Sequence, residues 1–100
     1  MTQERRRARR WSTAIECSWT RDARITDLST SGCYVYTRYT PKVGDHVEFT
    51  ATIQDQPAQL CGTVAASTQG VGFGVAFDRL PEATTAALLA VLEQVARERA

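Results

Sequence analysis

Residues 46–53 read HVEFTATI, a segment in which apolar and polar side chains alternate without a break. Val47, Phe49, Ala51 and Ile53 fall on one face of an extended chain, and the intervening polar residues fall on the other. Because successive side chains of a β-strand point to opposite faces, this alternation predicts a strand with one buried face. It is the clearest strand in the sequence, and the rest of the fold can be worked out from it.

The same period of two continues on both sides of this segment, and turn residues separate the runs. A further strand is predicted at 23–29, and the predicted inward rows are Ile15, Cys17 and Trp19; Cys33, Val35 and Thr37; Leu60, Gly62, Val64 and Ala66; and Val71, Phe73, Val75 and Phe77. Gly44, in the turn before residue 46, is free to take a positive φ. Six short antiparallel strands with turns between them predict a small barrel or sandwich.

The period changes to that of a helix after residue 80. Residues 81–99 place Leu88, Leu89, Leu92 and Val95 at helical spacing, which predicts an amphipathic helix that docks this stripe on the barrel. The predicted fold is therefore all-β with one C-terminal helix. It is a single domain spanning 1–100, with a flexible basic arm at 1–11, a six-stranded antiparallel barrel at 12–79 and the helix at 81–99.

Composition excludes several classes of protein. A hydrophobic fraction of 43% with two Trp and only three Pro is typical of an ordered globular chain. Cys17, Cys33 and Cys61 are widely spaced and have only one histidine to join them, so we expect reduced thiols in a cytoplasmic protein and no metal site. No run approaches the ~18 apolar residues of a membrane span.

Little in the sequence points to catalysis. His46, the one histidine, falls on the polar face of its strand without a neighbouring nucleophile, and we expect a solvated imidazole. Residues 70–74 (GVGFG) do not match a phosphate-binding glycine loop, and their glycines are expected to let a strand bend or be approached closely. We therefore expect no enzyme, no catalytic residue and no cofactor.

A run of arginines precedes the first strand. Residues 5–10 read RRRARR and hold five of the twelve Lys and Arg residues. The chain has a formal net charge of +1, so residues 11–100 sum to −3 once the +4 of the first ten residues is removed. The positive charge is local, which indicates an anionic partner for this run.

A second polar stretch, residues 27–32 (DLSTSG), has the composition of a strand end and a turn. Paired with arginines it offers a further chemistry. A guanidinium can bond O6 and N7 of guanine, clamp a phosphate or lie flat on a purine. Asp27 can accept from guanine N1 and N2, Ser29 can bond a phosphate or nearby backbone, and Gly32 lets the backbone turn without a side chain that blocks the ligand. Together they can hold a guanine nucleotide.

In this order, residues 4–10 (ERRRARR) and 27–32 resemble the paired RxxxR and (D/N)xSxxG motifs of PilZ domains, bacterial receptors for cyclic di-GMP. The resemblance extends to residues 43–47, to 72–77 and to the closing helix. It implies a second-messenger receptor that binds cyclic di-GMP and signals to an unidentified protein partner. The ligand-binding residues that it implies are Arg5, Arg6, Arg10, Asp27, Ser29 and Gly32.

The arginine run permits two registers of the RxxxR motif, Arg6 with Arg10 or Arg5 with Arg9. Family members commonly read ERRRxPR followed by an apolar residue, and superposing that pattern favours Arg6 and Arg10, with Arg7 and Arg9 solvated. An arginine immediately before the motif is associated in the family with a stacked pair of ligands, and Arg5 has that position. The resemblance thus implies two cyclic di-GMP molecules per domain, and one or two remains open.

Other interpretations stay open. One is a PilZ-like adaptor that binds protein and no nucleotide, and another is a barrel that binds nucleic acid through a basic arm, which the acidic remainder disfavours. Self-association into a homodimer is not excluded. Tyr34, Tyr36 and Tyr39 are expected on the barrel surface or facing a partner rather than as ligand platforms. Ala65 and Ala66 lie where many relatives have a tryptophan, a departure from the family pattern that leaves no aromatic ring at these two positions.

Overall fold

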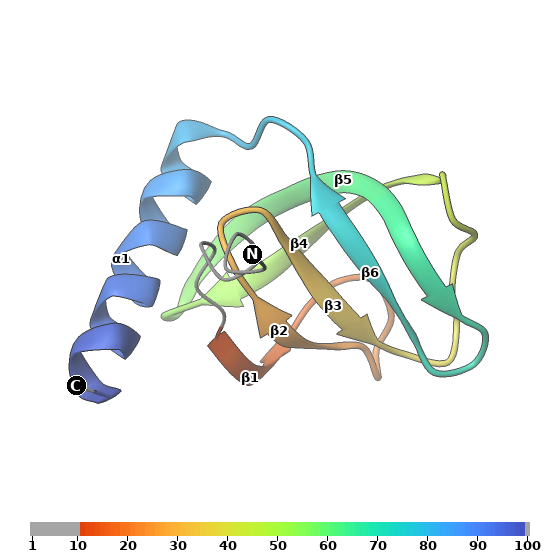
Figure 1. The fold of residues 1–100 in the computed structure, drawn as a ribbon, viewed down its shortest axis with the longest axis horizontal. Helices are drawn as coiled ribbons and strands as arrows, with labels where there is room; N and C mark the ends of the chain where they lie inside the picture. Colours follow the sequence, from red (N-terminus) through yellow and green to blue (C-terminus); the bar gives the residue numbers. More distant parts are fainter. Residues whose placement is uncertain (1–10, 100) are drawn as a thin grey trace, which may run out of the picture.

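The structure, a computed structural model, describes residues 11–99 (Figure 1). It contains six strands and one helix: β1 (Trp11–Glu16), β2 (Arg24–Leu28), β3 (Gly32–Tyr36), β4 (His46–Ile53), β5 (Gln56–Thr68), β6 (Gly72–Phe77) and α1 (Glu82–Arg99). The predicted order of six strands followed by a helix is confirmed. Trp11, which the sequence placed in the basic arm, is the first residue of β1, and the helix begins at Glu82 rather than at residue 81.

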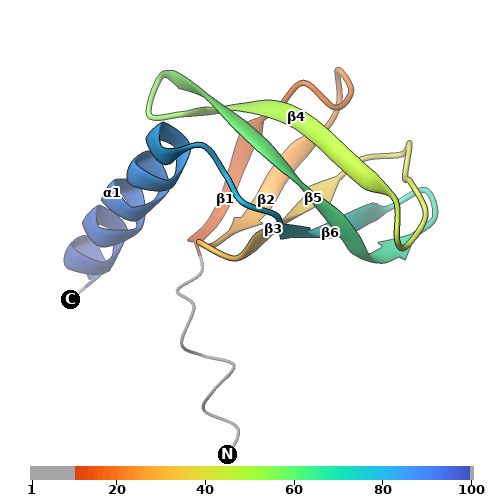
Figure 2. The same ribbon diagram turned by 90° about the horizontal axis from the view of Figure 1, so that it is seen from above.

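All six strands belong to one antiparallel sheet with the order β1-β2-β3-β6-β5-β4. The sheet curls until its two edge strands approach each other, giving a half-barrel (Figures 1 and 2). Cys17 and Ala51 form an isolated bridge across this seam, and the amide of Ser18 donates to the carbonyl oxygen of Thr50 at 2.8 Å. The predicted antiparallel barrel is therefore confirmed in its strands and closes through a short seam.

Strand β5 starts earlier than the sequence predicted. Gln54 and Asp55 both have positive φ, 52° and 66°, which makes a two-residue hairpin turn, so pairing with β4 resumes at Gln56. Pro57 falls within the strand because this part of β5 pairs with β4 alone, and pairing with β6 begins only at Gly62.

A bulge changes which residues face inward near the end of β5. The register with β6 shifts between Val64 and Ala66, leaving Ala65 as the extra residue. Val64 is buried, whereas Ala66, which we expected to face inward, is exposed. The bulge thus ends the inward row and brings small side chains to the outer face of the sheet.

The core lies inside the curl and is built from the inward rows of all six strands and from the helix. Phe73 is fully buried at its centre, and its ring meets that of Trp19 edge to face with centroids 5.2 Å apart. The Trp19 indole N–H donates to the carbonyl oxygen of Tyr39 at 2.8 Å, which fixes the ring. Val71, predicted as the first residue of this inward row, instead lies in the preceding turn and is 44% exposed.

Helix α1 packs against β4 and β5 beside the sheet (Figure 2). Its buried positions are Thr84, Leu88, Val91 and Leu92. Leu89, which the predicted stripe included, is 53% exposed because it points away from the sheet, one helical step of about 100° beyond Leu88. Among residues 11–99, no helix is both long and apolar enough to span a membrane.

Candidate ligand-binding site

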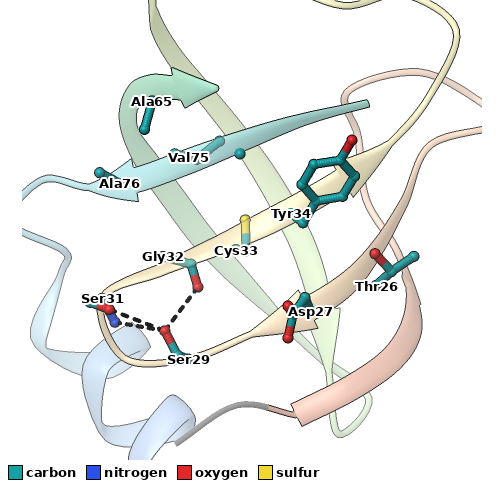
Figure 3. A pocket seen from close by; sticks show the side chains of 11 residues that line it. Thr26, Asp27, Ser29, Ser31, Gly32, Cys33, Tyr34, Ala65, Val75 and Ala76 are labelled. Carbon is teal, nitrogen blue, oxygen red and sulfur yellow. Dashed lines mark hydrogen bonds between the residues drawn. The ribbon is translucent and has the colours of Figure 1, made fainter. Parts of the chain in front are cut away.

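The turn between β2 and β3 is organised by the hydroxyl of Ser29. Its Oγ accepts the amide N–H of Ser31 at 3.2 Å and lies 3.3 Å from the carbonyl oxygen of Gly32, while the amide of Ser29 donates to that same carbonyl at 2.9 Å (Figure 3). Ser29 is only 5% exposed. Of the two roles that the sequence left open for this side chain, the structure shows the bond to nearby backbone.

Gly32 is required by the close approach of β6. A Cβ at this position would lie 2.3 Å from the carbonyl oxygen of Val75, too close for any real side chain. Gly32 does not have a positive φ, so the turn itself does not demand glycine. The structural reason for glycine here is therefore packing, because a side chain at Gly32 would push β3 and β6 apart beside the turn.

The β2–β3 turn forms one side of an open cavity of about 580 Å³ on the outer face of the sheet. Asp27, Ser29 and Ser31 line it on that side, and Ala65, Gly74 and Ala76 line it on the β5–β6 side (Figure 3). The volume falls in the range of small-molecule sites, roughly 300–1,000 Å³. The arrangement gives polar groups along one wall and bare backbone with methyl groups along the other.

Gly74 and Ala76 line the cavity with side chains no larger than a methyl group, so the backbone of β6 is accessible there. A Cβ added at Gly74 would make only ordinary contacts, at 3.8 Å from the Tyr34 ring and 4.0 Å from the Ala66 methyl. Gly74 therefore differs from Gly32, since the sheet has room for a side chain there. Such a side chain would occupy the cavity rather than strain the fold.

Charge in the described lining is of one sign. Among the described lining residues, Asp27 is the only one of the four types Asp, Glu, Lys and Arg. Cys33 also lines the cavity, but burial above all, with smaller effects from Cys17 and Asp27, raises the pKa of its thiol to about 12. The thiol is thus neutral at physiological pH, and an anionic ligand needs cations from outside this lining.

The pairing of β1 with β2 places Trp11, the residue that follows the arginine run, next to the end of β2. Trp11 pairs with Leu28, and Ser12 pairs with Asp27. The arginine run ends at Arg10, which is bonded to Trp11, and consecutive Cα atoms are about 3.8 Å apart. Arg5, Arg6 and Arg10, the predicted phosphate and guanine ligands, themselves lie outside the described residues.

Sequence reasoning missed Tyr34 as a lining residue. We expected it on the barrel surface or facing a partner, and it does lie on the outer face of the sheet, where it also lines the cavity. The signal available was its position in β3, where it alternates with the buried Cys33 and Val35 and must face outward. Which strand lies next to β3 could not be deduced from that pattern.

The remaining polar side chains that the sequence raised lie elsewhere. His46 is exposed, with Nε2 3.3 Å from a Glu48 carboxylate oxygen and Nδ1 3.4 Å from one of Asp78. The three cysteines are unpaired thiols. Within residues 11–99, no cluster of three His, Cys, Asp or Glu side chains is arranged to hold a metal ion.

The half-barrel, its C-terminal helix and the outer-face cavity define a small sheet domain with an open cavity at the β2–β3 turn. The chain belongs to the PilZ family: the PilZ domain model matches residues 4–94. A similar solved structure is that of the Bacillus subtilis inhibitor of motility (MotI/DgrA), with a TM-score of 0.79 at 11% identity. The match covers 96% of this chain and 53% of that one, and at this identity it shows the fold alone. No curated protein matches the sequence.

Proposed function

We propose that the domain is a receptor for cyclic di-GMP, which binds in the outer-face cavity beside the β2–β3 turn. The observation that supports the proposal is the pairing of Trp11, the residue after the arginine run, with Leu28, which lies in the sequence between Asp27 and Ser29 of the cavity lining. Membership in the PilZ family supports the same ligand. The role is one of binding and signalling in the bacterial cytoplasm, with no catalytic step.

The phosphates and guanines of the ligand can be matched to the residues proposed to bind them. Cyclic di-GMP has two phosphates and two guanines, so its anionic groups need the cations that the described lining lacks. Arg6 and Arg10 supply them as charge-assisted, bidentate donors, and Arg5 adds a further guanidinium for a second stacked ligand. Asp27 accepts from the N1 and N2 hydrogens of a guanine. Ser29 holds the turn, and the exposed residue Ser31 lines the cavity with its hydroxyl 3.2 Å from that of Ser29.

Signalling in this proposal depends on a movement of the arginine run when the ligand binds. In this proposal they close over the ligand from the β1 side and change the surface that the domain presents beside α1 and β1. A partner protein then recognises the liganded surface. Amide exchange across residues 3–11 with and without cyclic di-GMP tests this step, which requires slower exchange in the complex.

The experiment is a calorimetric titration of cyclic di-GMP into wild type and Asp27→Asn. The substitution keeps the shape of the side chain and removes its charge, so we expect about tenfold weaker binding, the difference between a charged and a neutral acceptor. Asp55→Asn is the matched control. It makes the same change in net charge in the β4–β5 turn, outside the cavity lining, where asparagine tolerates the positive φ of 66°.

Equal weakening in both variants would contradict the role of Asp27, because the loss of one negative charge by itself favours an anionic ligand. A wild-type protein that is folded and gives no heat with cyclic di-GMP would contradict the receptor proposal as a whole. That result would favour the adaptor, a PilZ domain that binds protein without nucleotide.

A further inference from the structure

Tyr34 lies across two glycines of the neighbouring strand. It faces outward from β3, directly opposite Gly74 in the register with β6. Its Cε2 and hydroxyl oxygen lie 2.6 and 2.7 Å from where a Cβ of Gly72 would be, and its Cδ1 lies 3.8 Å from the corresponding point at Gly74. The ring therefore occupies the space that a side chain at Gly72 would need, and it covers that residue, which is buried although it faces outward.

This contact holds the ring at the border of the cavity. Tyr34 is half-buried and lines the cavity together with Gly74, whereas Gly72 is not part of the lining. Beyond the ring the floor is formed by Gly74, Ala76 and Ala65, none of which has a side chain larger than a methyl group. Figure 3 shows the Tyr34 ring on β3, with Asp27 on the adjacent strand β2.

Flat aromatic ligands suit such an arrangement. A base gains from stacking on an aromatic side chain, and the gain is larger when the ring is already held in place and loses little freedom on binding. Small residues beside the ring let the base approach the backbone of the sheet. A carboxylate on the next strand can then meet the hydrogen-bonding edge of the base.

We propose that Tyr34 and the low floor beside it form a base-stacking subsite, in which a guanine of the ligand packs against the Tyr34 ring while Asp27 accepts its N1 and N2 hydrogens. The subsite rests on the proposed function, because it takes one base of the same cyclic di-GMP. The ring carries the interaction, and the hydroxyl is dispensable.

The test compares cyclic di-GMP binding to wild type, Tyr34→Leu and Tyr34→Phe by calorimetry. Leucine keeps an apolar side chain over Gly72 but removes the ring, and we expect binding about 5- to 100-fold weaker. Phenylalanine should restore affinity to within about threefold of wild type, since the ring remains. Tyr36→Ala is the matched control: it lies two residues along the same strand, is 57% exposed and is outside the cavity lining.

A measurement on the wild-type complex keeps the test independent of how the variants fold. Nuclear Overhauser contacts are expected between the Tyr34 ring protons and the guanine H8 proton. Their absence in a saturated complex, or equal affinity of folded Tyr34→Leu and wild type, would overturn the subsite and leave the receptor proposal standing. A wild-type protein that does not bind cyclic di-GMP would overturn both.

Discussion

Replacing Arg10 with alanine is expected to weaken cyclic di-GMP binding by at least about 100-fold. A guanidinium that clamps a phosphate or a guanine edge makes two charge-assisted hydrogen bonds, each contributing about 1.5–3 kcal/mol. Their joint loss exceeds the ~2.8 kcal/mol that corresponds to a factor of about 100 in Kd. The effect should be large because Arg10 is the arginine attached to Trp11, whose partner Leu28 lies between Asp27 and Ser29.

Arg7→Ala is the control, because it removes the same charge from the same run at a position expected to be solvated. We expect its affinity to stay within about threefold of wild type, the effect of one exposed charge. Titrating Arg9→Ala as well settles the register. A large loss for Arg9→Ala with a small one for Arg10→Ala would select Arg5 and Arg9, and equal losses for all three would indicate a general attraction of charge.

Replacing Phe73 with alanine is expected to lower the free energy of unfolding by about 3–5 kcal/mol. Phe73 is fully buried, packs edge to face on Trp19, and lies on β6 between β3 and β5, so the neighbouring strands cannot close the space it leaves. A loss of this size is a large part of the stability of a small domain, about 5–15 kcal/mol in all.

Urea denaturation followed by Trp fluorescence measures this loss. Val71→Ala is the control, because it removes an apolar side chain two residues earlier that is 44% exposed in the turn, and a change within about 0.5 kcal/mol is expected. If Phe73→Ala cost less than about 1 kcal/mol, the inward row of β6 would not be the centre of the core.

Local alternation was enough to predict the strands, because each has one face in the core. Residues 46–53 form β4 with the bounds read from the sequence. Predictions from this alternation were wrong where a bulge or a tight turn interrupted the regular strand. The bulge at Ala65 turned Ala66 outward, and the tight turn at Gln54 and Asp55 let β5 begin at Gln56. Neither departure alters the hydrophobic pattern enough to be recognised from the sequence.

The candidate site divides in the same way. Asp27, Ser29 and Gly32 are close together in the chain, so the polar turn and its resemblance to the PilZ motif pointed to them, and all three line the cavity. Tyr34 and Gly74 are 40 residues apart and meet only because β6 pairs with β3, a long-range contact that no local pattern reveals. The resemblance to PilZ domains suggested the proposed ligand, and the pairing of Trp11 with Leu28 could be read only from the structure.

The central claim is that cyclic di-GMP occupies the cavity on the outer face of β3 and β6. Calorimetric titration of cyclic di-GMP into wild type and Gly74→Val tests it most directly. Valine suits a strand, and a Cβ at Gly74 meets only ordinary contacts, so the variant is expected to fold, which its melting temperature checks, while its side chain extends into the cavity. The account predicts that wild type binds and that Gly74→Val binds about tenfold or more weakly, the cost of overpacking a fitted site. Equal affinity for the two folded proteins, or no binding by wild type, would contradict it.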